Sequence, residues 1–478
     1  MIESKQLKQL MLESGVGFGT SGARGLVSSM TDEVCAGYTH AFVKTMQRSY
    51  DFQRVAVAID LRPSSPDIAQ ACANMLSQLG LQVIFCGAIP TPALALFAQT
   101  HRIPGIMVTG SHIPYDRNGL KFYRPDGEIS KSDETAMLAS EVQPLLQNSN
   151  ALPPEDMSAK YDYIQRYKSL LGHNALSGLK LAIYQHSSVG RDLLSVLLQD
   201  LGAEVICLER SDTFVPIDTE AVSPEDVEKG LAWSRKYSVD AIISTDGDGD
   251  RPLISDEKGQ WLRGDIVGLL TAKALKMTHL AVPVSCNTAI EASGLFHKVT
   301  RTRIGSPFVI AAMEEIKRSG TNSIAGFEAN GGFLLGSANT EYENLAPLPT
   351  RDAVLPIVCL LAEVKRQNKP LSELVANLPQ RFTASDRLQN FPNEKSHALL
   401  QAWTQAPAEL LSTLEIDENV ISADITDGLR LTLVSGNIIH LRPSGNAPEL
   451  RCYVETPNQT TSITLVNDVL NKLKLLVG

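Results

Sequence analysis

Three segments of the chain share one order of apolar and polar positions: an apolar strand, a polar loop, an amphipathic helix, a glycine and a second apolar strand. The first spans 54–87, where Ser65 suits a helix start and Gly80 suits its end. The second spans 179–209, and a looser copy spans 279–305. Strands that alternate with helices of this length predict βαβ units and largely parallel sheets.

The last hundred residues follow a different pattern. In "DGLRLTLVSGNIIHLRPSGNAPELRCYVE" (427–455), leucines alternate with polar residues, "SGN" predicts a turn, and a second strand follows. The final segment, "TSITLVNDVLNKLKLLVG" (461–478), is typical of a helix packed on such a sheet. This part predicts an antiparallel α+β domain.

A chain of 478 residues is long enough for several domains, because single cores stop growing near ~250–300 residues. We predict three related α/β domains with mixed, largely parallel sheets and a C-terminal α+β domain, arranged around a central cleft. Boundaries are expected in "QNSNALPPEDMS" (147–158), after Asp256 and near "NLPQRF" (377–382). The predicted domains are 1–150, 151–256, 257–375 and 376–478.

Composition and charge narrow the class of protein. The net charge is −10 and no long basic run occurs, which argues against nucleic acid as a partner, so any phosphate site must be local. The seven cysteines are scattered without CxxC spacing and indicate neither a disulfide framework nor a zinc site. The start of the chain lacks a signal-like apolar region and no long apolar stretch occurs, so we expect a cytoplasmic protein without a membrane partner. No apolar stripe exceeds what the cores need, and we expect a monomer or a weak homodimer.

The acidic loop "DGDGDR" (246–251) follows the apolar run "VDAIIST". Alternate residues of a strand lie ~6.6 Å apart, too far for three side chains to hold one ion. Gly247 and Gly249 would let the chain curl, so that the three aspartates converge. Converging carboxylates repel one another unless a hard cation such as Mg²⁺ or Ca²⁺ lies among them.

The same spacing imitates an EF-hand, with Glu257 at its twelfth position. Against a calcium loop, Arg251 stands where the turn requires glycine and the preceding segment indicates a strand. An arginine beside the acids also indicates that an anionic group comes to the same place. A calcium-stapled carbohydrate-binding protein remains the alternative outside enzymes.

Four other loops carry polar residues suited to a phosphorylated sugar. The serine loop "MVTGSHIPYDRNGLKFY" (107–123) holds Ser111, either a nucleophile or a loop hydroxyl, with His112 and Lys121 able to move protons or attract phosphate. No GxSxG motif is present, which disfavours acyl transfer. The Gly-rich "FGTSGARG" (18–25) offers Arg24 to an anion but is not a P-loop.

The last two loops suit phosphate and hydroxyl groups. The phosphate loop "RPSGNAPELR" (442–451) supplies hydrogen-bond donors, although a simple hairpin end is an equal interpretation. Its candidate donors are Arg442, Ser444, Gly445, Asn446 and Arg451. The sugar loop "GFEANGGF" (326–333) places Glu328 and Asn330 on a flexible turn, where a carboxylate and an amide can bind sugar hydroxyls or merely face solvent.

In this order the loops resemble the α-D-phosphohexomutase family of phosphomannomutases and phosphoglucomutases, over nearly the whole chain. The family's T-A-S-H-N-P corresponds to "TGSHIP", D-G-D-G-D-R is unaltered, R-x-S-G-T-E-P appears as "RPSGNAP", and G-E-x-S-G-H appears as the divergent "FEANGG". The stretches "DLRPSS" (60–65) and "GAIPTPAL" (87–94) are also similar to the family.

The resemblance implies a phosphoserine enzyme that interconverts hexose 1- and 6-phosphates through a hexose 1,6-bisphosphate, with mannose expected first and glucose second. One Mg²⁺ would be held by phosphorylated Ser111 with Asp246, Asp248 and Asp250, and Arg24, His112, Lys121 and Arg251 would surround the same centre. The four domains would then carry, in chain order, the phosphoserine, the metal, the sugar and the distal phosphate. The implied substrate-binding residues are Glu328, Asn330, Thr302, Gly305, Arg442, Ser444, Gly445, Asn446 and Arg451.

Departures from the family pattern concern the substrate more than the reaction. The Ser and His positions of the sugar loop are occupied by Asn330 and Gly332, which removes donors that usually help to select the sugar. The basic residues of the phosphate loop remain, although Asn446 and Ala447 replace Thr and Glu. Phosphoglucomutase, phosphoglucosamine mutase and a metal-dependent phosphatase therefore stay as alternatives.

Overall fold

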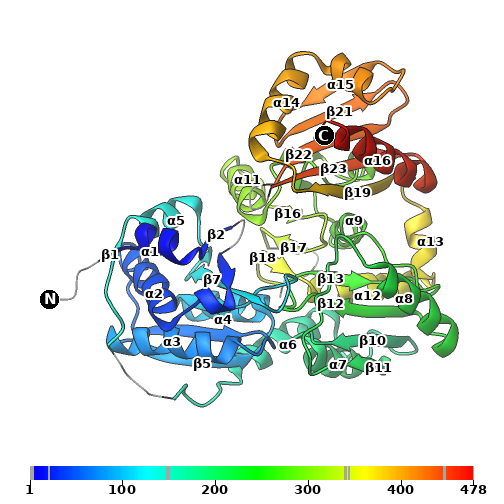
Figure 1. Cartoon of the computed structure of the whole chain (residues 1–478). Helices are drawn as coiled ribbons and strands as arrows, with labels where there is room; N and C mark the ends of the chain where they lie inside the picture. Colours follow the sequence, from blue (N-terminus) through cyan, green and yellow to red (C-terminus); the bar gives the residue numbers. More distant parts are fainter. Residues whose placement is uncertain are drawn as a thin grey trace.

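The computed structural model describes residues 5–19, 22–146, 151–338, 342, 345–444 and 448–476. Four main sheets follow one another along the chain, each covered by helices close to it in sequence (Figure 1). The first three contain parallel strands and the last is antiparallel. The predicted fold class, three α/β units followed by an α+β unit, is confirmed.

The first sheet has the strand order β2-β3-β7-β6-β4-β5, with β8 paired to β7. Its parallel part is β4 flanked by β5 and β6. Helix α3 begins at Ser65 as predicted, and Gly80, with φ +75°, follows its end in the left-handed region. The strands are β2 (Gly17–Phe18), β3 (Ala23–Leu26), β4 (Arg54–Ile59), β5 (Gln82–Ala88), β6 (Gly105–Val108), β7 (Arg117–Arg124) and β8 (Gly127–Glu128), and the helices are α1 (Leu7–Ser14), α2 (Asp32–Met46), α3 (Ser65–Gln78), α4 (Thr91–His101) and α5 (Lys131–Leu138).

The second and third sheets repeat this arrangement, with orders β11-β10-β12-β13 and β15-β14-β16-β17-β18. The looser third copy has only one helical turn, α10, between β14 and β15. The second unit contains α6 (Ser158–Leu171), β10 (Lys180–His186), α7 (Arg191–Asp200), β11 (Glu204–Arg210), α8 (Pro224–Tyr237), β12 (Ala241–Thr245) and β13 (Pro252–Ile254). The third contains α9 (Gly264–Ala274), β14 (His279–Pro283), α10 (Ala289–Ala292), β15 (Lys298–Thr302), α11 (Ser306–Arg318), β16 (Ile324–Phe327), β17 (Phe333–Leu335), β18 (Leu348–Asp352), α12 (Val354–Gln367) and α13 (Leu371–Ala376).

The C-terminal sheet, at the top of Figure 1, is antiparallel with the order β19-β23-β22-β21-β20. Leu429, Leu431 and Leu433 are buried on one face, which confirms the predicted alternation. Helix α16 packs on β19 and β23. The elements are β19 (Phe382–Gln389), α14 (Asn393–Gln405), α15 (Pro407–Thr413), β20 (Val420–Asp424), β21 (Leu429–Leu433), β22 (Ile438–Pro443), β23 (Glu449–Thr456) and α16 (Gln459–Lys474); a short sheet pairs β1 (Lys5–Gln6) with β9 (Glu141–Val142), and Val27–Ser29 form one 3₁₀ turn, η1.

One apolar core runs without interruption through parts of the first three units, whereas the C-terminal unit has its own core. Where α6 meets β18, the hydroxyl groups of Tyr163 and Tyr167 donate to the buried carboxylate of Asp352. Continuous packing of this kind fixes the relative positions of the loops that follow the strands. The exact domain boundaries stay a prediction.

Two further sequence predictions concern cysteines and membranes. All seven cysteines are free thiols in the structure. Within the described ranges, no helix has both the length and the apolar character needed to cross a membrane. The cytoplasmic location and the oligomeric state remain predictions.

His440 of β22 makes stability depend on pH. Burial lowers its pKa from 6.5 to about 4, and its Nε2 lies 2.6 Å from the carbonyl oxygen of Asp427. As the pH falls, the unfolded chain binds this proton before the folded chain does. The contribution of His440 to the free energy of unfolding is therefore at its full value, about 3 kcal/mol, above pH 6.5 and is lost as the pH falls toward 4. In thermal unfolding at a series of pH values, His440→Gln should show a shallower decline over this window. The exposed His173→Gln should follow the wild type, and equal slopes for all three proteins would contradict the assignment.

Candidate active site

Ser111 lies in a clamped turn after β6. Its side chain is fully buried and its φ of +54° is in the left-handed region, which a serine adopts only when the surroundings hold it there. Arg62, itself 1% exposed, donates to the carbonyl oxygens of Ser111, Ile113 and Pro114 at 2.5–2.9 Å. The carboxylate of Asp60 holds the guanidinium of Arg62 at 3.2 Å. Sequence reasoning did not assign a role to Arg62, although "DLRPSS" drew attention to the segment.

The acidic loop reaches Ser111 directly after β12. Asp246 Oδ2 accepts a hydrogen bond of 2.7 Å from Ser111 Oγ, which joins residues 135 positions apart. A side chain at Gly247 would place its Cβ 2.8 Å from the carbonyl oxygen of Ser111, so only glycine permits this approach. Gly249, at φ +71°, makes the curl that the sequence predicted.

The EF-hand alternative is wrong. The loop lies between strands β12 and β13, not between helices. Glu257, the candidate twelfth ligand, instead accepts hydrogen bonds from the backbone and hydroxyl of Ser372. The acidic loop is therefore part of the Ser111 site.

The three aspartates form a buried group whose ligand oxygens all lie within 4.8 Å of one another. Burial and repulsion from Asp248 and Asp250 raise the pKa of Asp246 well above its ordinary value. Burial works in the same direction at Asp248, but Lys121 overcomes it and lowers the pKa of that carboxyl. One buried oxygen of Asp248 and one of Asp250 lack any hydrogen-bond partner among the described residues. Unpartnered carboxylate oxygens at this spacing fit a hard divalent cation.

The predicted basic residues gather around this group. Lys121, only 3% exposed, donates to Asp248 and Asp250 at 2.6 Å each. Arg251 donates from Nη1 to His112 Nδ1 at 3.0 Å, and this ring nitrogen lies 3.4 Å from Ser111 Oγ. The positive charge of Arg251, together with burial, lowers the pKa of His112, so the imidazole is neutral. Burial, together with the positive charges of Arg251 and Arg351, lowers the pKa of Arg24 to about 10.

Arg351, at the end of β18, joins the acidic loop to the sugar loop. Its guanidinium donates to Asp250 Oδ2 at 2.9 and 3.1 Å and to Glu328 Oε2 at 3.1 Å. A Cβ on Gly332 would lie 2.7 Å from the Arg351 side chain, so the glycine leaves room for the arginine. Sequence reasoning missed Arg351 because no motif marks "PLPTRD".

The remaining sugar-loop candidates are engaged in holding the backbone. Asn330 Oδ1 accepts from the Gly332 backbone at 3.0 Å, and its carbonyl oxygen accepts from Thr219 at 2.7 Å. The hydroxyl of Thr302 donates to the carbonyl oxygen of Arg303, and Gly305, at φ +129°, immediately precedes α11. Their substrate contacts stay predictions.

The phosphate loop presents a row of arginines. Arg442 lies opposite Arg451 in the β22–β23 pair, and Arg451 lies opposite Arg387 in the β23–β19 pair. Arg442 pairs with Asp427 at 2.9 Å, and Arg387 and Arg451 share Glu449 at 3.6 and 3.7 Å. Three arginines therefore face two carboxylates, and the remaining positive charge fits a phosphate. Sequence reasoning missed Arg387. The serine of the loop, Ser444, donates its backbone N–H to Glu449, while Gly445 and Asn446 lie outside the described residues.

The electrostatic neighbours of Glu220 link the phosphate loop to the centre. Burial and Asp218 raise the pKa of Glu220, whereas Arg263, Arg251 and Arg451 act against them. Arg251 touches His112, and Arg451 belongs to the phosphate loop. The charges of Arg251 and Arg451 therefore act on the same carboxyl group.

Replacing Arg351 with methionine should lower kcat/KM for a phosphosugar by about 100-fold, because Asp250 and Glu328 would be left buried without their common cation. Steady-state kinetics would measure the fall in kcat/KM, and Arg351→Lys should recover part of the loss. The exposed Arg366→Met is the control. Wild-type kcat/KM in Arg351→Met would show that the bridge does not position the site.

Comparison with known proteins gives three domain matches described as phosphoglucomutase/phosphomannomutase alpha/beta/alpha domains I, II and III, at residues 15–147, 161–259 and 263–382. A phosphomannomutase of Salmonella muenchen is 51% identical over 98% of this chain and 97% of its own. One of Sinorhizobium fredii is 45% identical over 92% and 95%. A phosphoglucosamine mutase of Thermodesulfovibrio yellowstonii is 28% identical over 92% and 95%. The solved structure of a phosphoglucomutase/phosphomannomutase family protein from Burkholderia thailandensis has the same fold, with a TM-score of 0.73, 20% identity and coverage of 95% and 97%.

Proposed function

The chain belongs to the phosphoglucomutase/phosphomannomutase family, and from that premise we propose that it interconverts mannose 1-phosphate and mannose 6-phosphate. The observation that carries the proposal is the 2.7 Å contact between Ser111 Oγ and Asp246 inside a buried group of three carboxylates. A hydroxyl in that place is ready to carry a phosphoryl group beside a bound cation.

In the proposed reaction, phosphorylated Ser111 transfers its phosphoryl group to the free 6-hydroxyl of a hexose 1-phosphate. The bond between Ser111 Oγ and phosphorus breaks and a bond from the sugar oxygen to phosphorus forms. The proton that the sugar hydroxyl releases ends on Ser111 Oγ, and His112, 3.4 Å from that oxygen, is the group that would relay it. The phosphoryl group adds nearly two negative charges beside His112, which favours protonation of its ring. The resulting 1,6-bisphosphate turns over in the site and returns its 1-phosphoryl group to Ser111, which leaves hexose 6-phosphate.

The acidic loop fits Mg²⁺, with Asp246, Asp248, Asp250 and a phosphoserine oxygen as the proposed ligands. When bound, the cation would neutralise charge on the transferring phosphoryl group. Lys121, Arg251 and Arg24 add positive charge around the same group. The arginines of the phosphate loop would hold the phosphate that is not reacting, and Glu328 would bind sugar hydroxyls.

Mannose is proposed because the two phosphomannomutases are 51% and 45% identical to this chain, whereas the phosphoglucosamine mutase is 28% identical. The sugar loop gives a structural reason for a choice of sugar that differs from that of proteins with the usual loop. Arg351 fills the space beside Gly332 and pairs with Glu328. Glucose stays the second candidate.

The test is a substrate panel. Purified protein with Mg²⁺ and a trace of the matching bisphosphate would be given the 1-phosphates of mannose, glucose and glucosamine, and the 6-phosphate formed would be measured. We expect the highest kcat/KM with mannose 1-phosphate. Release of inorganic phosphate without isomer would indicate a phosphatase, and inactivity toward every sugar would overturn the proposal.

A further inference from the structure

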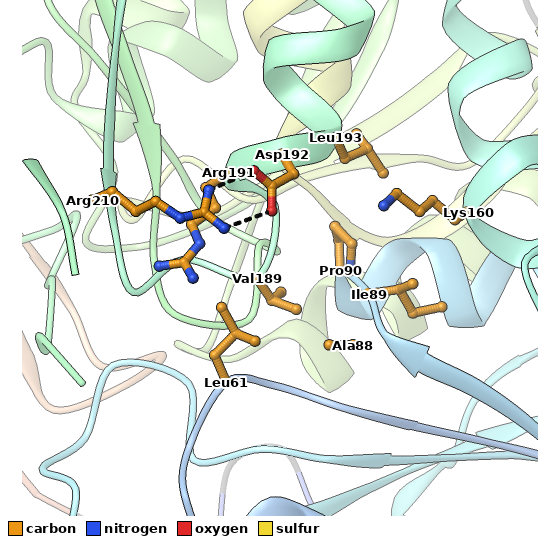
Figure 2. Close-up of a pocket in the computed structure, with 10 residues that line it drawn as sticks. All are labelled: Leu61, Ala88, Ile89, Pro90, Lys160, Val189, Arg191, Asp192, Leu193 and Arg210. Atoms are coloured by element: carbon orange, nitrogen blue, oxygen red, sulfur yellow. Dashed lines mark hydrogen bonds and ion pairs between the residues drawn. The ribbon is translucent and has the colours of Figure 1, made fainter. Parts of the chain in front are cut away.

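A cavity lies between the first and second units, where the β5–α4 connection meets the start of α7. Its volume is about 180 Å³, smaller than the ~300 Å³ at which pockets for larger organic ligands begin. Ile89, Pro90 and Val189 form apolar walls (Figure 2). Charged side chains line the rest of the cavity. None of them belongs to the Ser111 site.

Three cations and one carboxylate line this cavity: Lys160, Arg191, Arg210 and Asp192. Asp192 is neutralised by two hydrogen bonds from Arg210, at 2.6 and 3.1 Å. Lys160 makes no hydrogen bond to the part of the chain that the structure describes, and Figure 2 shows its amino group pointing toward the space beside Pro90 and Asp192. Arg191 in turn pairs with the exposed Asp212 at 3.5 Å, so the positive charge that no described carboxylate pairs is that of Lys160.

The cavity is also lined by hydrogen-bond donors. Arg191 is 7% exposed and donates from Nη1 to the carbonyl oxygens of His186 and Ser211, but its buried Nε has no partner among the described residues. The backbone N–H groups of Asp192 and Leu193, in the first turn of the ten-residue helix α7, form no backbone hydrogen bond to any described residue. Free N–H groups at a helix N-terminus favour an anion, and a buried unpaired guanidinium nitrogen adds a second, independent reason.

We propose that this cavity is a binding site for a small phosphate-bearing anion, either inorganic phosphate or a phosphate monoester of triose size. The walls of the cavity at Pro90 and Val189 continue into segments that contact the acidic loop. Thr91, next to Pro90, binds Asp248 through its backbone and hydroxyl at 2.9 and 2.6 Å, and the Val189 backbone donates to Gly247 at 3.0 Å. An occupant therefore lies against both segments that hold the acidic loop.

The test measures acetylation of Lys160 by quantitative mass spectrometry on the full chain, with inorganic phosphate or glycerol 3-phosphate as the probe and sodium chloride at matched ionic strength as the reference. The rate at Lys160 should fall about tenfold once the site is about nine-tenths occupied, while exposed Lys8 should not change. The probe that protects at the lower concentration identifies the source of the phosphate. The measurement does not depend on mutase activity, so the two proposals can fail separately.

Arg210→Ala supplies the matched variant, because it leaves Asp192 without its partner and turns the cavity toward negative charge. The Arg210 side chain is 47% exposed, so the fold should be retained, and an unchanged unfolding midpoint would verify it. Protection of Lys160 should then require at least about fivefold more phosphate. Equal acetylation rates in phosphate and in sodium chloride, or equal protection in Arg210→Ala and wild type, would overturn the proposal.

Discussion

Ser111→Ala should lose at least about 10³-fold in turnover with any hexose 1-phosphate, because Ser111 supplies the hydroxyl that contacts Asp246, while the neighbouring Thr91 hydroxyl donates to Asp248 instead. Alanine removes only the oxygen from a buried side chain, so the loss should come from the missing phosphoryl acceptor and not from unfolding. Intact mass should show about 80 Da added to part of the wild-type protein and none at residue 111 of the variant.

Ser132→Ala, an exposed serine on α5, controls for the chemistry of the substitution and should retain wild-type turnover. Thermal unfolding should give the same midpoint for Ser111→Ala within a few degrees, because serine and alanine both carry a Cβ and therefore share the strain of φ +54°. Substantial mutase activity in Ser111→Ala, with or without added bisphosphate, would remove the phosphoserine from the mechanism.

Asp248→Asn should lower turnover by at least about 100-fold and raise the Mg²⁺ concentration needed for half-maximal activity. The substitution keeps the shape of the side chain and its acceptor for Thr91, but removes one of three negative charges that a cation would share. Removal of divalent ions from the wild type with a chelator should produce a similar loss that added Mg²⁺ reverses. Turnover as a function of Mg²⁺ concentration is the measurement.

Asp67→Asn, on the exposed face of α3, is the control for charge and should leave the Mg²⁺ dependence unchanged. The Asp248→Asn protein should also unfold at a similar temperature, because Lys121 keeps Asp250 as a partner. If chelation leaves wild-type turnover intact, the carboxylates serve only to pair Lys121 and Arg351, and the metal proposal fails.

Local sequence was sufficient for several parts of the site. Glycines between the aspartates predicted a curled acidic loop, and Gly249 adopts the left-handed conformation that such a curl needs. Ser111 with His112, and the loop with Arg442, were identified from short stretches whose spacing matches one family. Helix α3 and the alternating strand β21 also followed from patterns within a few residues. In these cases, the interactions that define the feature lie within one turn or one strand.

Residues that act from distant positions in the chain could not be found in this way. Arg62 supports the serine loop from about 50 positions away, Arg387 joins an arginine row through strand pairing, and Arg351 holds Asp250 from 101 positions away. Nothing in the neighbouring sequence distinguishes Arg351 or Arg387 from arginines that face solvent, and "DLRPSS" marked the segment of Arg62 without indicating what the side chain contacts.

The sequence by itself determined the order of strands and helices, the antiparallel C-terminal sheet and the chemical groups of the loops, because backbone propensity, hydrophobic periodicity and glycine geometry act over short distances. Only the tertiary structure decided which carboxylate contacts Ser111, which cation bridges Asp250 to Glu328, and where a cavity lined by Lys160 lies. Those features depend on the packing of separate sheets on one another, and a charge that is solvated in an isolated segment becomes a directed contact only when that packing excludes water.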